Sequence, residues 1–160
     1  MGIEIERKFL IDKEKFLDAH RPLQLEDNTY IAQGYLSTDP ERTVRVRVMG
    51  NTGYITVKGK SSEDGLTRFE WETEINVNEA KAMLEMCTGL ISKLRYYIRH
   101  DGKTWEIDVF DDDNSGLIVA EIELQSETET ITLPSWVTVE VTGDPKYYNS
   151  ALTKHPYKDW

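Results

Sequence analysis

Charged and apolar residues alternate one by one near the start of this sequence, and this period of two constrains the fold more than any other feature. Residues 3–10 read IEIERKFL, which places Glu4, Glu6 and Lys8 on one side and mostly apolar residues on the other. Such a period indicates a β-strand with two unlike faces. Two carboxylates about 6.6 Å apart on one face repel by about 2.5 kcal/mol at an effective dielectric constant of about 20. An enclosed face of this kind therefore needs a cation.

The same alternation recurs along the chain, so we expect a β-dominated protein with two or three helices. Short turns, including Asp101-Gly102, predict hairpins between neighbouring strands. Further strands are expected at residues 29–37, 42–49, 54–60, 66–75, 91–100, 103–110 and 117–125, with a short ninth strand at 137–141. Helical spacing predicts helices at residues 12–19, before Pro22, at 76–87 and at 144–154.

The charges on these strands are sorted by sign. Basic residues occur together at Arg45 and Arg47, Lys58 and Lys60, and Lys93 and Arg95, and acidic residues at Glu70, Glu72 and Glu74, and at Glu121 and Glu123. For one strand, a solvated outer face is the simpler interpretation, but such faces usually mix signs. The helices also need an apolar surface to pack on, and the apolar strand faces supply it.

We therefore predict an α+β fold dominated by strands. It is a closed eight-stranded antiparallel β-barrel, or tunnel, with helices packed on the outside and charged side chains lining the inside. Residues 1–160 would form this single domain. A lumen with charges of both signs is costly unless it holds a polyvalent ligand. Lys and Arg bind phosphate oxygens and clustered carboxylates bind Mg²⁺ or Mn²⁺, so the pattern indicates a nucleotide or polyphosphate with its metal.

Composition narrows the classes of partner and compartment. The net charge of −10 argues against electrostatic binding to nucleic acid or to an anionic membrane. No apolar run is long enough to span a membrane, and the N-terminus lacks the apolar block of a signal peptide. The single cysteine, Cys87, fits a reducing compartment. We expect a cytoplasmic protein with a small-molecule substrate.

A series of motifs resembles, in order and over nearly the whole chain, the CYTH superfamily, the triphosphate tunnel metalloenzymes. The first motif is Glu4-x-Glu6-x-Lys8 at the N-terminus. The later ones are Arg45-x-Arg47 after Gln33-Gly34-Tyr35-Leu36, Thr56-Val57-Lys58, Arg68-x-Glu70-x-Glu72, Lys93-x-Arg95-Tyr96, Glu106-Ile107-Asp108-Val109-Phe110, Glu121-Ile122-Glu123, and Glu140-Val141-Thr142 before Lys146-Tyr147-Tyr148-Asn149.

The resemblance implies a tunnel that binds a triphosphate and hydrolyses or cyclises it with a divalent metal. By this resemblance, Mg²⁺ or Mn²⁺ is held by Glu4, Glu6, Asp108, Glu121 and Glu123. Phosphate oxygens are bound by Lys8, Arg45, Arg47, Lys58, Lys93, Arg95 and Lys146. Arg68, Glu70 and Glu72 line the tunnel, and the residues expected to act in catalysis are Glu4, Glu6, Lys8, Glu121 and Glu123.

The leading prediction is a divalent-metal-dependent triphosphatase that hydrolyses inorganic triphosphate to pyrophosphate and phosphate. No Ser/His or Cys/His nucleophile arrangement is apparent, so water would attack phosphorus directly. Thiamine triphosphatase and class IV-type adenylate cyclase remain open on the same fold, although nothing marks a pocket for a ring. A non-catalytic polyphosphate-binding module is a third alternative, against which the paired carboxylates argue. A Val-rich outer face left uncovered by helices would indicate a homodimer. The sequence alone does not show which strand faces the helices cover.

Overall fold

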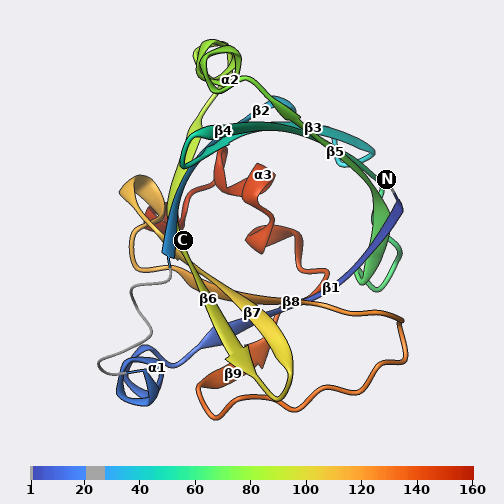
Figure 1. Cartoon of the computed structure of the whole chain (residues 1–160), viewed down its shortest axis with the longest axis vertical. Coiled ribbons are helices and arrows are strands. Elements are labelled where there is room, and N and C mark those ends of the chain that lie inside the picture. Colours follow the sequence, from blue (N-terminus) through green and yellow to red (C-terminus); the bar gives the residue numbers. More distant parts are fainter. Residues whose placement is uncertain (1, 21–27) are drawn as a thin grey trace.

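Eight antiparallel strands close on themselves in the computed structural model, which describes residues 2–20 and 28–160 (Figure 1). Around the barrel they follow the order β1 (Gly2–Ile11), β5 (Thr67–Ile75), β4 (Thr52–Gly59), β3 (Arg42–Met49), β2 (Asn28–Ser37), β6 (Leu90–His100), β7 (Lys103–Phe110) and β8 (Ile118–Glu123), which returns to β1. The barrel closes where residues 2–5 of β1 pair with residues 67–70 of β5. The predicted eight-stranded antiparallel barrel is thus confirmed.

The strands begin and end within two residues of the predicted positions, because turns and the period of two define them. Asp101 and Gly102 both have positive φ, at 49° and 77°, which a two-residue hairpin turn of this kind requires. The short ninth strand, β9 (Val137–Glu140), pairs with the second half of β1. Arg7, the charged residue on the apolar side of β1, donates two hydrogen bonds to Glu140, at 2.8 and 2.7 Å. This ion pair joins β9 to the outside of the barrel.

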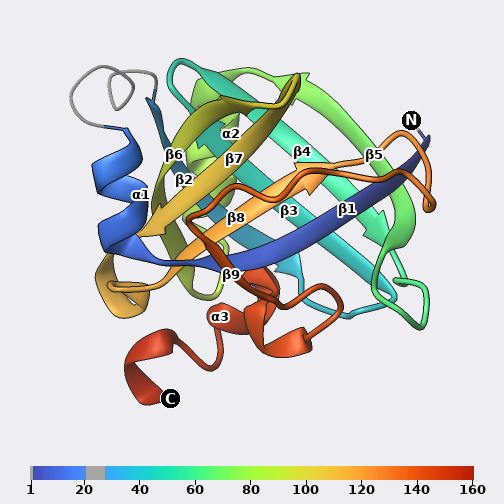
Figure 2. The same ribbon diagram turned by 90° about the horizontal axis from the view of Figure 1, so that it is seen from below.

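Two helices lie outside the barrel, as predicted (Figures 1 and 2). The helix α1 (Lys13–Ala19) is capped by the Asp12 side chain and buries Phe16. The helix α2 (Val77–Leu84) is capped by Asn76 and packs on β4 and β3. It ends earlier than predicted. Pro22, expected to follow the first helix, lies outside the described residues.

The last predicted helix, residues 144–154, is divided in two. A 3₁₀ turn, η2 (Pro145–Tyr147), is separated from α3 (Asn149–Leu152) by Tyr148, whose backbone is extended. The helix α3 does not lie against the outer wall but across one end of the barrel (Figure 2). Leu152 packs there in a small apolar cluster with Ile91, Phe110, Leu117 and Val119. The C-terminal segment therefore closes this end.

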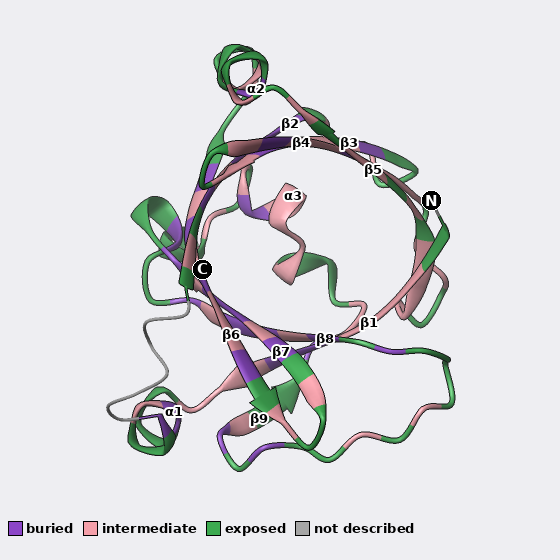
Figure 3. Ribbon diagram, in the orientation of Figure 1, coloured by how far each residue is buried: buried purple, intermediate pink, exposed green. Residues whose placement is uncertain are grey.

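The main hydrophobic core lies outside the barrel wall. It includes the outward residues of β1, β6, β7 and β8 and the aromatic rings of Phe16 and Trp136. Trp105 is fully buried between Phe9 and Trp136. Buried residues are concentrated on this side of the barrel (Figure 3). Because the apolar side chains face outward here, the charged side chains on the opposite strand face point into the lumen. Within the described part of the chain, no helix is both long and apolar enough to cross a membrane.

Candidate active site

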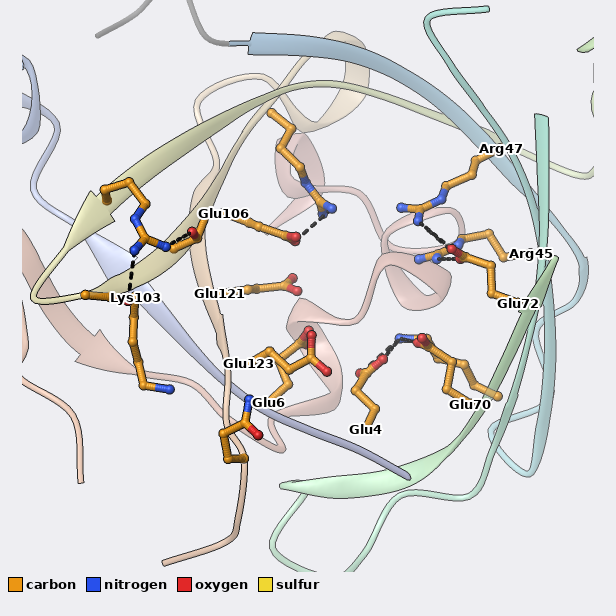
Figure 4. Close-up of a pocket in the computed structure, with 16 residues that line it drawn as sticks. Glu4, Glu6, Arg45, Arg47, Glu70, Glu72, Lys103, Glu106, Glu121 and Glu123 are labelled. Atoms are coloured by element: carbon orange, nitrogen blue, oxygen red, sulfur yellow. Dashed lines mark hydrogen bonds and ion pairs between the residues drawn. The ribbon is translucent and has the colours of Figure 1, made fainter. Parts of the chain in front are cut away.

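A cavity of about 400 Å³ occupies the lumen and is lined mainly by charged side chains (Figure 4). Glu6, Glu121 and Glu123 gather on one wall, and Arg45 and Arg47 reach in from the other. Their positions follow from strand alternation and from pairing: Glu6 lies opposite Glu123 across β1 and β8. A smaller cavity of about 50 Å³ adjoins it toward the closed end and shares several lining residues with it. We call this smaller space the inner compartment.

The predicted acidic residues of β1 and β8 all reach the main cavity. Burial raises the pKa of Glu6 well above its usual range, and the charges of Glu121 and Glu4 raise it further. Burial would also raise the pKa of Glu121, but the ammonium of Lys8, 3.5 Å away, lowers it to about 2. The pKa values of these two neighbouring carboxyl groups are therefore shifted in opposite directions.

A second acidic group includes Glu4 and Glu70, which share the ammonium of Lys58. The Lys58 nitrogen lies 2.9 Å from Glu4 and 3.1 Å from Glu70. Burial would raise the pKa of Glu4, but its hydrogen bond with Glu70 and the charge of Lys58 lower it to about 2. Burial and the contact with Glu4 raise the pKa of Glu70 to about 7. Near neutral pH, Glu70 can thus donate a hydrogen bond to the Glu4 carboxylate.

These carboxylates have the chemistry of a site for a hard divalent cation, since they offer several oxygen ligands in one cavity. Within residues 2–20 and 28–160, however, no group of three or more His, Cys, Asp or Glu side chains is already gathered to hold a metal ion. The long glutamate side chains would have to rotate toward one another to share a cation.

The basic wall of the main cavity is held in place by Glu72. Its carboxylate lies 3.5 Å from Arg45 and 3.2 Å from Arg47, and it accepts a 2.6 Å hydrogen bond from the Thr56 hydroxyl. Burial and the neighbouring Arg45 charge lower the pKa of Arg47 to about 10, a value at which the group remains charged at neutral pH. Arg47 also lies over the ring of Tyr54. Both guanidinium groups are therefore oriented toward the lumen before any ligand binds.

Asp108 is placed by the structure behind the cavity wall rather than in it. Its side chain is 1% exposed and accepts hydrogen bonds from Lys93 at 2.7 Å and from Arg95 at 2.7 and 2.9 Å. Burial would raise the pKa of Asp108, but these two cations lower it well below the usual range. Both oxygens are thus engaged in orienting basic residues. The predicted role of Asp108 as a metal ligand remains a prediction.

The last predicted phosphate-binding residue, Lys146, is not brought to the cavity. Its ammonium lies 3.9 Å from the centre of the Trp160 ring, and it lines none of the three cavities of the described chain. Lys8 and Arg68, by contrast, line the inner compartment, where both cations lie over the ring of Tyr148 at 5.6 and 5.9 Å.

The structure adds residues that the sequence did not single out as functional. Glu106 lines the main cavity and lies 2.8 Å from Arg95, and Arg99 and Lys103 line it near the turn between β6 and β7. Alternation could have identified Arg99 and Glu106, because Arg99 shares a strand face with Lys93 and Arg95, and Glu106 shares one with Asp108. Lys103 has the opposite parity to Glu106 and lines the cavity from the turn at the start of β7, so alternation does not indicate it. Tyr148 and Asn149 line the inner compartment. Neither charge nor hydrophobic periodicity marks these two residues. They reach the compartment because the segment predicted to be one helix is interrupted at Tyr148.

The family and several relatives of this chain are consistent with this arrangement. Residues 2–154 match the CYTH domain family. The inorganic triphosphatase of Acetivibrio thermocellus is 46% identical over 162 residues, which cover 100% of this chain and 99% of that protein. The inorganic triphosphatase of Nitrosomonas europaea is 36% identical over 155 residues, covering 93% and 95%. A crystal structure of an inorganic triphosphatase, 32% identical, superposes with a TM-score of 0.62 and covers 94% of this chain and 97% of that one. The chain therefore belongs to the CYTH domain family.

Proposed function

We propose that this protein hydrolyses inorganic triphosphate to pyrophosphate and phosphate in the lumen of its barrel, with Mg²⁺ or Mn²⁺. The observation that carries the proposal is the lining of the main cavity. In the described chain, that lining combines basic and acidic side chains and includes no aromatic ring. A base or a thiazole ring would have nothing to stack on, whereas phosphate oxygens and a divalent cation would each find matching groups. The names of the two relatives, both inorganic triphosphatases, support the same substrate.

The basic residues would bind the substrate through its phosphate oxygens. Arg45, Arg47 and Lys58 face the main cavity, and Lys8 and Lys93 face the inner compartment. Because these cations are already held by ion pairs with the acidic residues of the wall, little reorganisation is needed when charge develops in the transition state.

The metal would be held by the carboxylates of Glu4, Glu6, Glu121 and Glu123, whose oxygens are the ligands that such cations prefer. When bound, a divalent ion would neutralise charge on the phosphate oxygens as a Lewis acid. Asp108 would have a different task, which is to keep Lys93 and Arg95 oriented toward the substrate, and its ion pairs with both support this role.

The chemical step would be an in-line displacement by water. The water oxygen forms a bond to a terminal phosphorus while the bond from that phosphorus to the bridging oxygen breaks, and pyrophosphate leaves with the bonding electrons. A carboxylate of the cavity accepts the proton of the attacking water. The basic residues that bind the substrate stabilise the charge on the departing pyrophosphate.

A comparison of substrates tests this proposal. Phosphate release would be measured from inorganic triphosphate, thiamine triphosphate, ATP and pyrophosphate, each with Mg²⁺, with Mn²⁺ and with a chelator. We expect the highest kcat/KM for inorganic triphosphate and no release with the chelator. A preference for an organic triphosphate would contradict the substrate assignment. Tight binding of triphosphate without turnover would favour a non-catalytic binding module.

We also propose a cytoplasmic location, on the strength of the single cysteine and the acidic composition. The proposed substrate is a small molecule, and the net charge of −10 disfavours nucleic acid as a partner.

A further inference from the structure

The C-terminal segment does more than close the barrel, because two of its residues reach the space where substrate would bind. Tyr148 and Asn149 line the inner compartment together with residues of the strands. The extended backbone of Tyr148, with φ −66° and ψ 133°, separates the preceding 3₁₀ turn from α3. This break turns Asn149 toward the lumen instead of letting it continue one helix face.

The hydrogen bonds of Asn149 fix the orientation of its amide group. Its Oδ1 accepts from the Lys93 ammonium at 2.9 Å and from Gln33 Nε2 at 3.1 Å. An ammonium group can only donate, so the atom facing Lys93 must be the amide oxygen. The Asn149 amide nitrogen is therefore on the other side. Within the described chain, this nitrogen has no hydrogen-bond partner, and it is not among the buried polar atoms without partners. Because Asn149 lines the inner compartment, this unbonded nitrogen is the donor that its side chain can offer to a ligand there.

Lys93 also has a hydrogen-bond donor available to a ligand. Its ammonium carries three N–H donors, of which one is bonded to Asp108 at 2.7 Å and one to Asn149. The side chain is 1% exposed, yet it lines the inner compartment. One donor thus remains for a ligand, next to the free amide donors of Asn149.

The inner compartment is far more basic than the main cavity. Among its described lining residues, two carboxylates, those of Glu6 and Glu121, face six cationic side chains, which are Lys8, Arg45, Lys58, Arg68, Lys93 and Arg95. With a volume of about 50 Å³, it has room for a single small group. A terminal phosphoryl group has the size, the negative charge and the acceptor oxygens that this compartment and its donors suit.

We infer that Asn149 is a substrate-binding residue that donates a hydrogen bond to the terminal phosphoryl group of the triphosphate, while its carbonyl oxygen positions Lys93 for the same group. This inference rests on the proposed function for the identity of the substrate. It gives the C-terminal segment a direct part in recognition, because the segment supplies one of the donors and holds another.

Two substitutions separate the two roles of Asn149. Asn149→Ala removes both the donor and the acceptor, and Asn149→Asp keeps an acceptor for Lys93 but removes the donor. A hydrogen bond to a charged group contributes about 1.5–3 kcal/mol, which corresponds to a change of about 10- to 100-fold. We expect both variants to lose about this factor in kcat/KM for inorganic triphosphate. They should also lose it in affinity for metal-free triphosphate, measured by calorimetry with a chelator. Asn78→Ala, an exposed asparagine at the start of α2, is the matched control and should behave as wild type.

Several outcomes would overturn the inference. If Asn149→Asp binds triphosphate as wild type and only Asn149→Ala is impaired, Asn149 merely positions Lys93. If only Asn149→Asp is impaired, the effect is charge repulsion without a contact. If neither is impaired, Asn149 has no part in binding. A wild type that binds triphosphate without hydrolysing it would contradict the proposed function, while the calorimetric comparison would still decide the role of Asn149.

A double-mutant comparison gives a second, independent test. If Asn149 acts only through Lys93, Asn149→Ala should cause no further loss of triphosphate affinity once Lys93 is replaced by Met. Direct donation to phosphate predicts a further loss of about tenfold in that background, as one hydrogen bond to a charged group implies. Thermal unfolding of each variant, compared with Lys93→Met alone, shows whether the double variant is folded when it is assayed.

Discussion

Glu6 is a carboxylate of the lumen whose negative charge is poorly compensated by its neighbours. Burial and two neighbouring carboxylates disfavour its ionised form, and the nearby cations Lys58 and Lys8 offset this only in part. A carboxylate in such a position is a cost to the folded protein unless a ligand compensates it. Its place on the acidic wall, beside Glu123, therefore has a functional rather than a structural explanation (Figure 4).

Replacing Glu6 with Gln should lower the kcat of metal-dependent hydrolysis by at least about 100-fold. The fold should remain intact. The amide has the same shape, but it cannot supply the charge that a divalent cation needs. In chelator, the variant should be at least as stable as wild type, because a carboxylate that burial disfavours is gone. Unchanged phosphate release from inorganic triphosphate by this variant would refute the metal assignment.

Asp108 is expected to matter for stability as well as activity. Asp108→Asn leaves Lys93 and Arg95 buried with an incomplete partner, which should lower the free energy of unfolding at pH 7 by about 3–5 kcal/mol. The pKa of Asp108 in the folded protein is below its ordinary value of 3.8. This contribution is therefore fully present above about pH 4 and is lost as the pH falls through the lowered pKa. Urea unfolding across this range measures it; a neutral effect at pH 7 would contradict the assigned role.

The sequence predicted most of the site residues that lie on strands, although Arg99 and Glu106 were not singled out, and it missed Tyr148 and Asn149, which do not lie on strands. Glu4, Glu6 and Lys8 line the cavities because alternation fixes which face each side chain takes. Lys146 does not, since the backbone of its segment obeys no such period. Asn149 carries no charge, and its contact with Lys93 joins residues 56 positions apart, so no local pattern could indicate it.

At the scale of secondary-structure elements, the packing of α2 on the barrel depends on a close contact between two small residues. A Cβ added at Gly53 in β4 would lie 2.6 Å from the Cβ of Ala80 in α2, which is fully buried. Glycine at this strand position thus allows the helix to approach the sheet. Glycine weakens a strand, but at this position it permits the close packing of α2 on β4.

Gly53→Ala should lower the free energy of unfolding by about 1–3 kcal/mol, as overpacking does. In the Ala80→Gly background, the same substitution should cost less, because the clashing methyl group is gone. Thermal unfolding of the four proteins gives the coupling. Additive effects would mean that α2 does not rest on Gly53. Activity should change little, since neither residue lines the cavities.

Most helices and strands could be predicted from the sequence, and the exception is the C-terminal segment predicted as one helix. Nine strands and the two outer helices within the described residues follow from hydrophobic period, turns and caps. The segment from Asp144 onward has helical spacing and an early proline, but its placement depends on tertiary contacts. Leu152 packs on apolar residues at one end of the lumen, and Asn149 bonds to Lys93. These long-range contacts break the expected helix.

On the scale of the whole molecule, most strands have one charged face and one apolar face, and the closed barrel gives each face its own environment. The core is placed between the outer wall and the segments that cover it, and the lumen is left for charge. The basic and acidic groups of the lumen neutralise one another only in part, so ligands should stabilise the whole fold.

Mn²⁺ or Mg²⁺ should accordingly raise the unfolding temperature of the wild type. At a concentration 100 times the dissociation constant, the gain would be about 2.7 kcal/mol. Glu6→Gln should show little of this shift, because it lacks a central carboxylate ligand. Differential scanning calorimetry with and without chelator measures both proteins. An equal shift in the two proteins would indicate that the metal binds elsewhere.

Phosphorus NMR of inorganic triphosphate mixed with the wild-type protein and Mg²⁺ shows whether the charged lumen hydrolyses this substrate. Triphosphate resonances should disappear while pyrophosphate and phosphate appear in equal amounts. Neither product should form in chelator or with Glu6→Gln, and pyrophosphate should persist. Triphosphate that stays intact with Mg²⁺ and folded wild-type protein would show that the lumen does not hydrolyse it.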